Sequence, residues 1–210
     1  MTGQRSSATQ PTSRPYETLL AKGEERKLRI LTAAQQLLVR RGWRNTTLAQ
    51  IAREAGVSSA GLLHHFESKQ QLLHAVLEAR DIDDDLHADR SGDLLEELER
   101  VADRFERAPD LVAMFVVLLV ENLQPDAPLH DRLHQRYHSS VETVAAAIRR
   151  GQATGRYRAD LDPAVKAVEI VAFLFGMETS WLLNPSIPVT DVFAGYTRSI
   201  AQQLAPASTC

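Results

Sequence analysis

The sequence predicts an all-α protein of about nine helices, with a small three-helix N-terminal head joined to a larger helical body. Apolar residues recur at three- and four-residue steps through most of the chain, which is the period of a helix with one buried face. Hydroxyl residues or Asp precede many of these segments, and Gly, Pro or Asn follows them, as at helix ends. The 210 residues are 44% hydrophobic, which suffices for a buried core without disulfides.

The composition and the ends of the chain favour a cytoplasmic protein. The one cysteine, Cys210, is the last residue, so no internal disulfide can form. No run of about 18 uncharged apolar residues is present, so we expect no membrane span. Residues 1–15 lack the apolar middle of a signal peptide, and residues 1–22 are expected to form a disordered arm.

The net charge of −3 conceals an asymmetry along the chain. Residues 1–80 hold 12 Lys and Arg against 6 Asp and Glu, or +6, which leaves 12 against 21, or −9, for residues 81–210. A basic N-terminal third on an acidic body is the charge distribution of a protein that contacts a polyanion with one end.

The head is expected over residues 23–67 and begins with a helix over 23–41. Gly42 follows this helix, at a position where a residue without Cβ easily adopts the left-handed conformation. Thr47 and Gln50 have the spacing of a capping box, which opens the second helix.

The stretch from Thr46 to Phe66, TTLAQIAREAGVSSAGLLHHF, contains two short amphipathic helices that meet at a tight turn. Gly56 ends the first helix, and Ser58 or Ser59 caps the second. This pattern is typical of a DNA-binding helix-turn-helix, whose second helix enters the major groove. The alternative is a small helical bundle without a DNA role. The spacing of four core positions argues against that alternative: Ala52, Gly56, Val57 and Leu62.

The same stretch resembles the TetR family of bacterial transcriptional repressors. The resemblance covers roughly residues 24–78, and the matching positions are Thr47, Leu48, Ile51, Ala52, Ala55, Gly56, Val57, Ser58, Leu62, Phe66, Ser68, Lys69 and Leu72. It implies a DNA-binding regulator that acts as a homodimer and responds to a small molecule. The rest of the chain is similar in being all-helical and of the expected length.

The resemblance implies a set of DNA contacts on the head. The candidate DNA-binding residues are Arg44, Thr46, Thr47, Ser58, Ser59, Ala60, Gly61, Leu63, His64, His65 and Lys69. Among these, Thr47, His65 and Lys69 would contact phosphates. Leu63 stands where the family commonly has Tyr, and His64 could replace the missing aromatic contact in part. Because the groove-facing residues are small, we expect DNA shape to contribute to sequence preference.

The body is expected over residues 68–205, followed by a frayed tail over 206–210. Ser68 and Gln71 have capping-box spacing at its first helix, and further helices are expected over 91–107, 110–123, 128–155, 163–183 and 190–204. The resemblance implies that the last two helices pack against their copies in a homodimer. Two recognition helices would then lie about 34–36 Å apart on a palindromic operator of double-stranded DNA.

The resemblance also implies a ligand pocket between the central helix over 110–123 and its neighbours. The candidate ligand-binding residues are Phe105, Met114, Phe115, Leu118, Tyr137, Phe173, Met177 and Trp181, with Glu121, Asn122 and Glu178 as polar groups. Each of them is also a plausible core position. Met and aromatic side chains suit an adaptable apolar cavity, so we expect a small, largely apolar effector that releases the operator.

Two patterns of polar residues are compatible with a metal site. Residues 81–89 are strongly acidic, and His130, His134 and His138 share one helix face at four-residue steps. Neighbouring carboxylates on a helix point in different directions, so the acidic run is expected to be a solvated helix end and loop. Because of the histidines, a metal-sensing regulator is one alternative function. A ligand-independent DNA-binding protein is another.

The sequence contains no nucleophile elbow, no phosphate-binding Gly loop and no close triad of metal ligands. We therefore expect a regulator and not an enzyme, with no cofactor. Repression is favoured over activation by the family resemblance, and the residues themselves leave both open.

Overall fold

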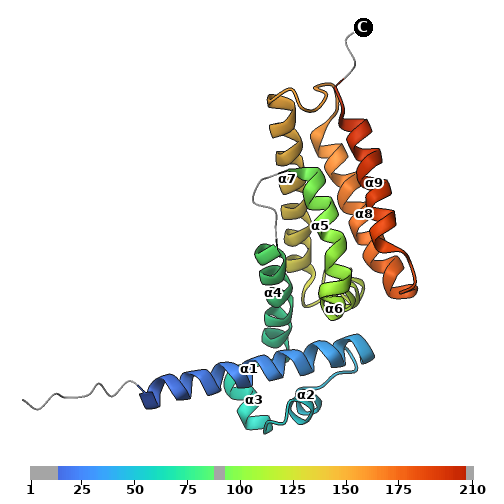
Figure 1. Cartoon of the computed structure of the whole chain (residues 1–210). Helices are drawn as coiled ribbons and strands as arrows, with labels where there is room; N and C mark the ends of the chain where they lie inside the picture. Colours follow the sequence, from blue (N-terminus) through green and yellow to red (C-terminus); the bar gives the residue numbers. More distant parts are fainter. Residues whose placement is uncertain (1–13, 88–92, 207–210) are drawn as a thin grey trace, which may run out of the picture.

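The computed structural model describes residues 14–87 and 93–206, and over these ranges the chain forms nine helices and no strand. The head contains α1 (Arg14–Arg41), α2 (Leu48–Glu54) and α3 (Ser59–His65), and α4 (Lys69–His87) rises from it. The body contains α5 (Leu94–Arg107), α6 (Pro109–Glu121), α7 (His130–Ala153), α8 (Pro163–Leu183) and α9 (Val189–Leu204). In Figure 1, α1 lies across the base of the molecule, α2 and α3 lie beneath it, and the body stands above. The all-α prediction is confirmed.

The first helix begins within the segment that was expected to be a disordered arm. It starts at Arg14 and runs through Gly23 without a break. Pro15 lies in its first turn, where the missing N–H has no helical partner to lose. Residues 1–13 and 207–210, and with them the remainder of the arm and most of the predicted tail, lie outside the described residues.

Several helix starts follow the predicted capping chemistry. Asp162 caps α8, since its Oδ1 accepts from the backbone N–H of Ala164 at 2.8 Å. Ser68 precedes α4 and accepts from Gln71 N at 3.0 Å. In return, Gln71 Oε1 accepts a hydrogen bond from Glu67 N at 2.6 Å, whereas a standard capping box would use Ser68 N. Such caps use donors that the first helical turn leaves free.

Residues 81–87 of the acidic run form the end of α4, and several of their carboxylates are engaged in ion pairs, while Asp89 lies outside the described residues. Asp81 binds Arg136, and Asp84 binds Arg104 at 2.8 Å. The expectation of a solvated helix end and loop is therefore wrong for Asp81 and Asp84. Arg104 and Arg136 lie on distant parts of the sequence, which is why the local pattern did not indicate these two pairings.

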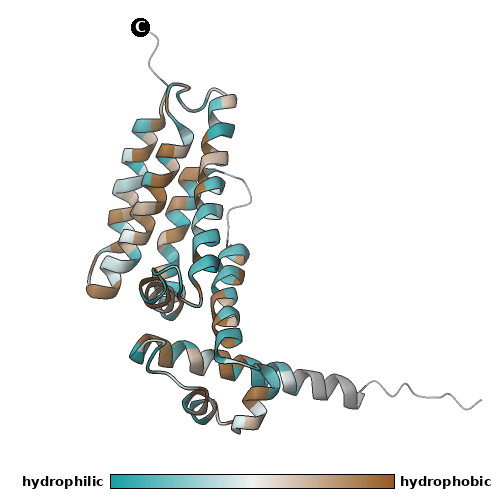
Figure 2. Ribbon diagram, turned by 180° about the vertical axis from the view of Figure 1, so that it is seen from behind, coloured by the Kyte–Doolittle hydropathy of each residue, from teal (hydrophilic) through white to brown (hydrophobic). Residues whose placement is uncertain are grey.

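The head and the body share one hydrophobic core. Buried residues of α1 to α4 pack together with Met114, Phe115 and Leu118 of α6 and with Leu129 and Leu133 at the start of α7. Two further clusters fill the body between α5, α7, α8 and α9 and between α5, α6, α8 and α9. Figure 2 shows hydrophobic and hydrophilic residues alternating along these helices, as expected where one face is buried. The head is thus packed directly onto the body.

Candidate functional site

The helix-turn-helix is built by local caps and a small buried contact. Thr47 Oγ1 accepts from Gln50 N at 3.2 Å and Gln50 Oε1 accepts from Thr47 N at 2.8 Å, so the predicted capping box is confirmed. Ser58, and not Ser59, caps α3 by accepting from Gly61 N at 3.0 Å. Ile51, Ala52, Ala55 and Leu62 are buried between the two helices. This packing fixes the angle of α3 and leaves its other face outward.

Most candidate DNA-binding residues lie on that outward face or beside it. Ser58, Ser59, Ala60, Leu63 and His64 are exposed, as are Arg44 and Thr47, while Gly61, His65 and Lys69 are partly exposed. Burial, followed by the neighbouring charge of His64, lowers the pKa of the His65 imidazole. His65 therefore carries little positive charge at neutral pH in the free protein.

Thr46 is the exception among these candidates, because its side chain is fully buried. Its Oγ1 donates to Gly42 O at 2.8 Å, which ties the connector between α1 and α2 to the end of α1. In this conformation Thr46 supports the head from within.

Glu121, Trp43 and Lys69 form a joint between the head and the body. Glu121 Oε2, at the end of α6, accepts from Trp43 N at 2.6 Å. Lys69 Nζ donates to Trp43 O at 2.6 Å and lies 3.7 Å from the centre of the Trp43 ring. Burial lowers the pKa of the Lys69 ammonium, and the nearby Glu121 charge opposes that shift. Glu121, a candidate for ligand orientation, thus contacts the head backbone.

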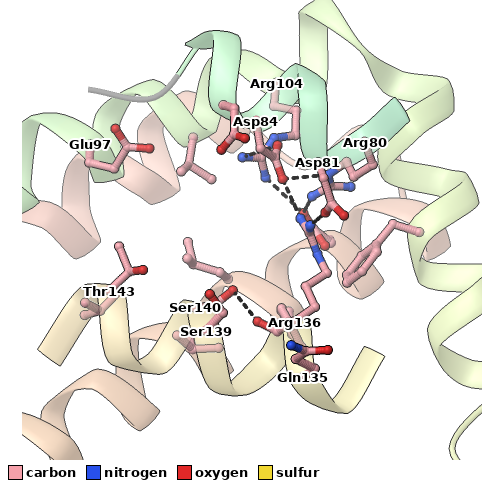
Figure 3. Close-up of a pocket in the computed structure, with 18 of the residues that line it drawn as sticks. Arg80, Asp81, Asp84, Glu97, Arg104, Gln135, Arg136, Ser139, Ser140 and Thr143 are labelled. Atoms are coloured by element: carbon pink, nitrogen blue, oxygen red, sulfur yellow. Dashed lines mark hydrogen bonds and ion pairs between the residues drawn. The ribbon is translucent and has the colours of Figure 1, made fainter. Parts of the chain in front are cut away.

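A cavity of about 500 Å³ opens in the body beside α4. Its apolar wall includes Val101, Phe115, Val144, Val171, Leu174 and Phe175, and its polar wall includes Arg80, Asp81, Asp84, Arg104, Arg132, Arg136 and Glu178. The volume lies within the range of small-molecule sites. Figure 3 shows Asp81, Asp84, Arg104 and Arg136 gathered at one end and Glu97 with Thr143 at the other.

Two of the candidate ligand-binding residues, Phe115 and Glu178, line this cavity. Phe105, Phe173, Met177 and Trp181 lie in the core cluster around Phe193, and Met114 and Leu118 lie in the core shared with the head. Tyr137 contacts the lining residue Phe175 through its ring. Asn122 is buried and bonds the backbone of Leu118 and Leu129 at 2.7 and 3.1 Å.

The polar wall is an ion-pair network that joins four helices. Arg80 Nη2 of α4 donates to Glu178 Oε1 of α8 at 2.5 Å, and Arg104 Nη1 of α5 lies 3.3 Å from the same oxygen. Arg136 Nη2 of α7 donates to Asp84 Oδ2 at 2.5 Å. Burial, together with the charge of Arg80, lowers the pKa of Arg136 to about 10. The network holds α4 against α5, α7 and α8.

Most residues of this network were not among the sequence candidates. One signal was available for Arg80, because it lies three and four residues after Leu77 and Val76 on the buried stripe of α4. A charged residue on a buried stripe needs a partner, but the sequence does not identify that partner.

The histidine stripe of α7 does not assemble a three-ligand metal site. His134 Nε2 and His138 Nε2 are 3.2 Å apart, while the His130 ring stacks on the His134 ring at 6.0 Å. Across residues 14–87 and 93–206, no group of three or more His, Cys, Asp or Glu side chains is arranged to hold a metal ion. Within the same ranges, no helix is long and apolar enough to cross a membrane.

The family model for bacterial regulatory proteins of the tetR family matches residues 30–76, from α1 to the middle of α4. The HTH-type transcriptional repressor KstR2 of Mycolicibacterium smegmatis is 30% identical over 165 residues, which cover 75% of this chain and 77% of KstR2.

Two solved structures have a similar fold. NalD, the secondary repressor of the MexAB-OprM multidrug efflux pump in Pseudomonas aeruginosa, aligns with a TM-score of 0.73 at 18% identity, covering 90% of this chain and 100% of NalD. The SmeT–triclosan complex aligns with a TM-score of 0.72 at 18% identity, covering 84% of this chain and 91% of SmeT. The match to the tetR family model and the similarity to KstR2 identify the chain as a member of the TetR family of bacterial regulatory proteins and a helix-turn-helix transcriptional regulator.

Proposed function

We propose that this regulator is a repressor that binds a palindromic operator as a homodimer and is released by a small-molecule effector. KstR2 and NalD are named as repressors, and SmeT was solved with triclosan, which supports repression and ligand response in this chain. The cavity carries both an apolar and a charged wall, so an amphipathic effector suits it better than a wholly apolar one.

The observation that carries this proposal is the path of α4. Its first residue, Lys69, contacts Trp43 in the head, and Arg80, Asp81 and Asp84 near its other end line the cavity. A ligand shifts a conformational equilibrium only if it binds one state better than the other. A ligand that alters the position of α4 in the body therefore acts directly on α3, because α3 immediately precedes α4 in the chain.

The outward face of α8 supports a homodimer. Val165 and Leu183 are 58% and 83% exposed, and Val168, Ala172 and Gly176 continue the same exposed stripe at three- and four-residue steps. An exposed stripe of apolar and small residues from Val165 to Gly176, with Leu183 beyond Thr179, is a common mark of an interface. We propose that α8, with α9 beside it, packs against the same helices of a second copy.

The proposal is tested by footprinting the purified protein on the DNA upstream of its own gene, together with sedimentation of the free protein. A dimer that protects an inverted repeat is the expected result, and addition of an effector should abolish the protection. Protection of DNA without sequence preference, falling equally with salt on every fragment, would instead identify a ligand-independent DNA-binding protein. Increased transcription from a promoter carrying the bound site would identify an activator.

A further inference from the structure

The carboxylate of Asp81 lies between two arginines of α7. Arg132 Nη2 binds Asp81 Oδ2, and Arg136 Nη1 binds Asp81 Oδ1, so each carboxylate oxygen has its own guanidinium. Arg132 and Arg136 are four residues apart on α7 and therefore project from the same side of the helix. The pair forms a two-arginine clamp, and Asp81 of α4 occupies it.

The clamp is accessible from the cavity. Arg132, Asp81 and Arg136 all line it, and their side chains are 40%, 26% and 18% exposed. The apolar wall lies in the same cavity and includes Val144, Leu174 and Phe175. A molecule that fills the cavity can therefore place an apolar part on this wall and a polar group at the clamp.

The charges at this end of the cavity favour an anion. Four arginines, Arg80, Arg104, Arg132 and Arg136, face three carboxylates, Asp81, Asp84 and Glu178, which leaves one surplus positive charge. Of the other two acidic lining residues, Asp85 is exposed to solvent and Glu97 lies at the opposite end of the opening (Figure 3). Planar guanidinium groups bind carboxylates in fixed, paired geometry, which a hydroxyl group cannot reproduce.

We propose that the effector is an amphipathic carboxylic acid, bound as its anion, whose carboxylate replaces that of Asp81 between Arg132 and Arg136. This inference rests on the proposed ligand response and specifies its chemistry. Because Asp81 belongs to α4, its displacement removes the ion pairs that join α4 to Arg132 and Arg136 of α7 and leaves the Asp84–Arg136 pair in place. The acid and Asp81 compete for one site, so ligand binding and the loss of the Asp81 contacts between α4 and α7 are the same event.

The head-group preference is tested by titrating the full-length protein, without DNA, with probes that share a tail. Decanoate, decanol and decyltrimethylammonium form one set, and naphthoate, naphthol and naphthylmethylammonium form the other. In at least one set, the acid is expected to bind about tenfold or more tightly than its neutral and cationic partners, because only the acid makes charge-assisted bonds to two guanidinium groups.

The competition is tested by two variants, each with a matched control. Asp81→Asn is expected to bind the acid about tenfold or more tightly, since it removes a competitor that occupies the clamp most of the time. Asp85→Asn removes the same charge from the same helix and the same cavity, and should change the affinity much less. Arg132→Ala should weaken acid binding about tenfold, whereas Arg149→Ala, also on α7 but outside the cavity, should have no effect.

A neutral or cationic probe that binds as tightly as the acid in both probe sets would overturn the proposal. So would equal effects of Asp81→Asn and Asp85→Asn, or the absence of acid binding to Asp81→Asn in both probe sets. Since these titrations contain no DNA, they separate a failure of the carboxylate proposal from a failure of operator binding, which footprinting detects independently.

Discussion

Arg80 of α4 and Glu178 of α8 form an almost fully buried ion pair, although 98 positions separate them in the sequence. Arg80 also reaches Asp84 at 3.3 Å and the backbone carbonyl of Leu111 at 3.2 Å. This arrangement fixes α4 against both α6 and α8. The position of α4, which joins the DNA-binding head to the body, therefore depends on charges in the body (Figure 1).

Removal of Glu178 should destabilise the fold strongly. Glu178→Ala leaves Arg80 and Arg104 buried with one carboxylate fewer, and loss of one partner from a buried ion pair costs about 3–5 kcal/mol. The free energy of unfolding, measured by urea denaturation at fixed protein concentration, gives the size of the loss. Glu142→Ala breaks an exposed pair with Arg149 and should cost at most about 1 kcal/mol. Equal losses in the two variants would contradict a buried, mutually dependent network.

Gly42 and Gly56 offer a matched test of the joint between head and body. Both have positive φ, +72° and +65°, but a Cβ at Gly42 would lie 2.4 Å from Glu121 Oε1, while nothing lies within 4 Å of one at Gly56. Gly56→Ala should cost about 1–2 kcal/mol for its backbone conformation alone. Gly42→Ala should cost about 1 kcal/mol more, because Glu121 must move and lose its bond to Trp43.

The extra cost at Gly42 should disappear when Glu121 is also replaced by Ala. Urea denaturation of the two single variants and the double variant forms a double-mutant cycle that isolates the interaction. If the costs at Gly42 and Gly56 are the same in the wild-type background, Glu121 does not occupy the position described here.

Operator binding should strengthen as the pH falls from about 7.5 to 5.5, and His65 should be responsible. Burial lowers the pKa of His65 in the free protein below its ordinary value of 6.5. A phosphate beside the imidazole would raise that pKa in the complex, so binding takes up a proton and affinity increases as pH falls through this window. The gain is about tenfold for each unit by which the two pKa values differ.

The pH effect is measured by fluorescence anisotropy of labelled operator at constant ionic strength. In His65→Gln the gain should vanish, because the side chain no longer titrates. A gain that persists in His65→Gln and disappears in His64→Gln would move the phosphate contact to His64.

A charge on the outward face of α8 should separate the homodimer. Val168→Glu would bury an unpaired carboxylate twice in a two-fold interface, which should weaken dimerisation about a hundredfold or more. Sedimentation velocity over a range of concentrations measures the shift from dimer to monomer. Leu86→Glu, on the exposed side of α4, is the control and should leave the dimer intact. An unchanged dimer in Val168→Glu would place the interface elsewhere.

The sequence by itself determined most of the helices, several of their caps and the identity of the head, but it left Ser58 and Ser59 open as the cap of α3 and placed the start of α1 too late. The capping box of Thr47 and Gln50, the cap at Ser58 and the Asp162 cap of α8 all join residues within three or four positions. Such bonds form whenever the local helix forms, so their spacing is readable from the chain. The apolar period likewise predicts which face of each helix is buried, and Ile51, Ala52 and Leu62 lie inside as expected.

Only the tertiary structure decided which buried faces meet, and therefore where the cavity and the joint lie. Glu121, expected near a ligand, meets Trp43 in the head, and the apolar candidates around Phe105 and Trp181 fill a core instead of the cavity wall. Arg136 and Asp81 became cavity residues because the last turns of α4 meet α7 through ion pairs. Which distant segments pair depends on the packing of the whole body. The spacing of apolar residues along a single helix does not specify that packing.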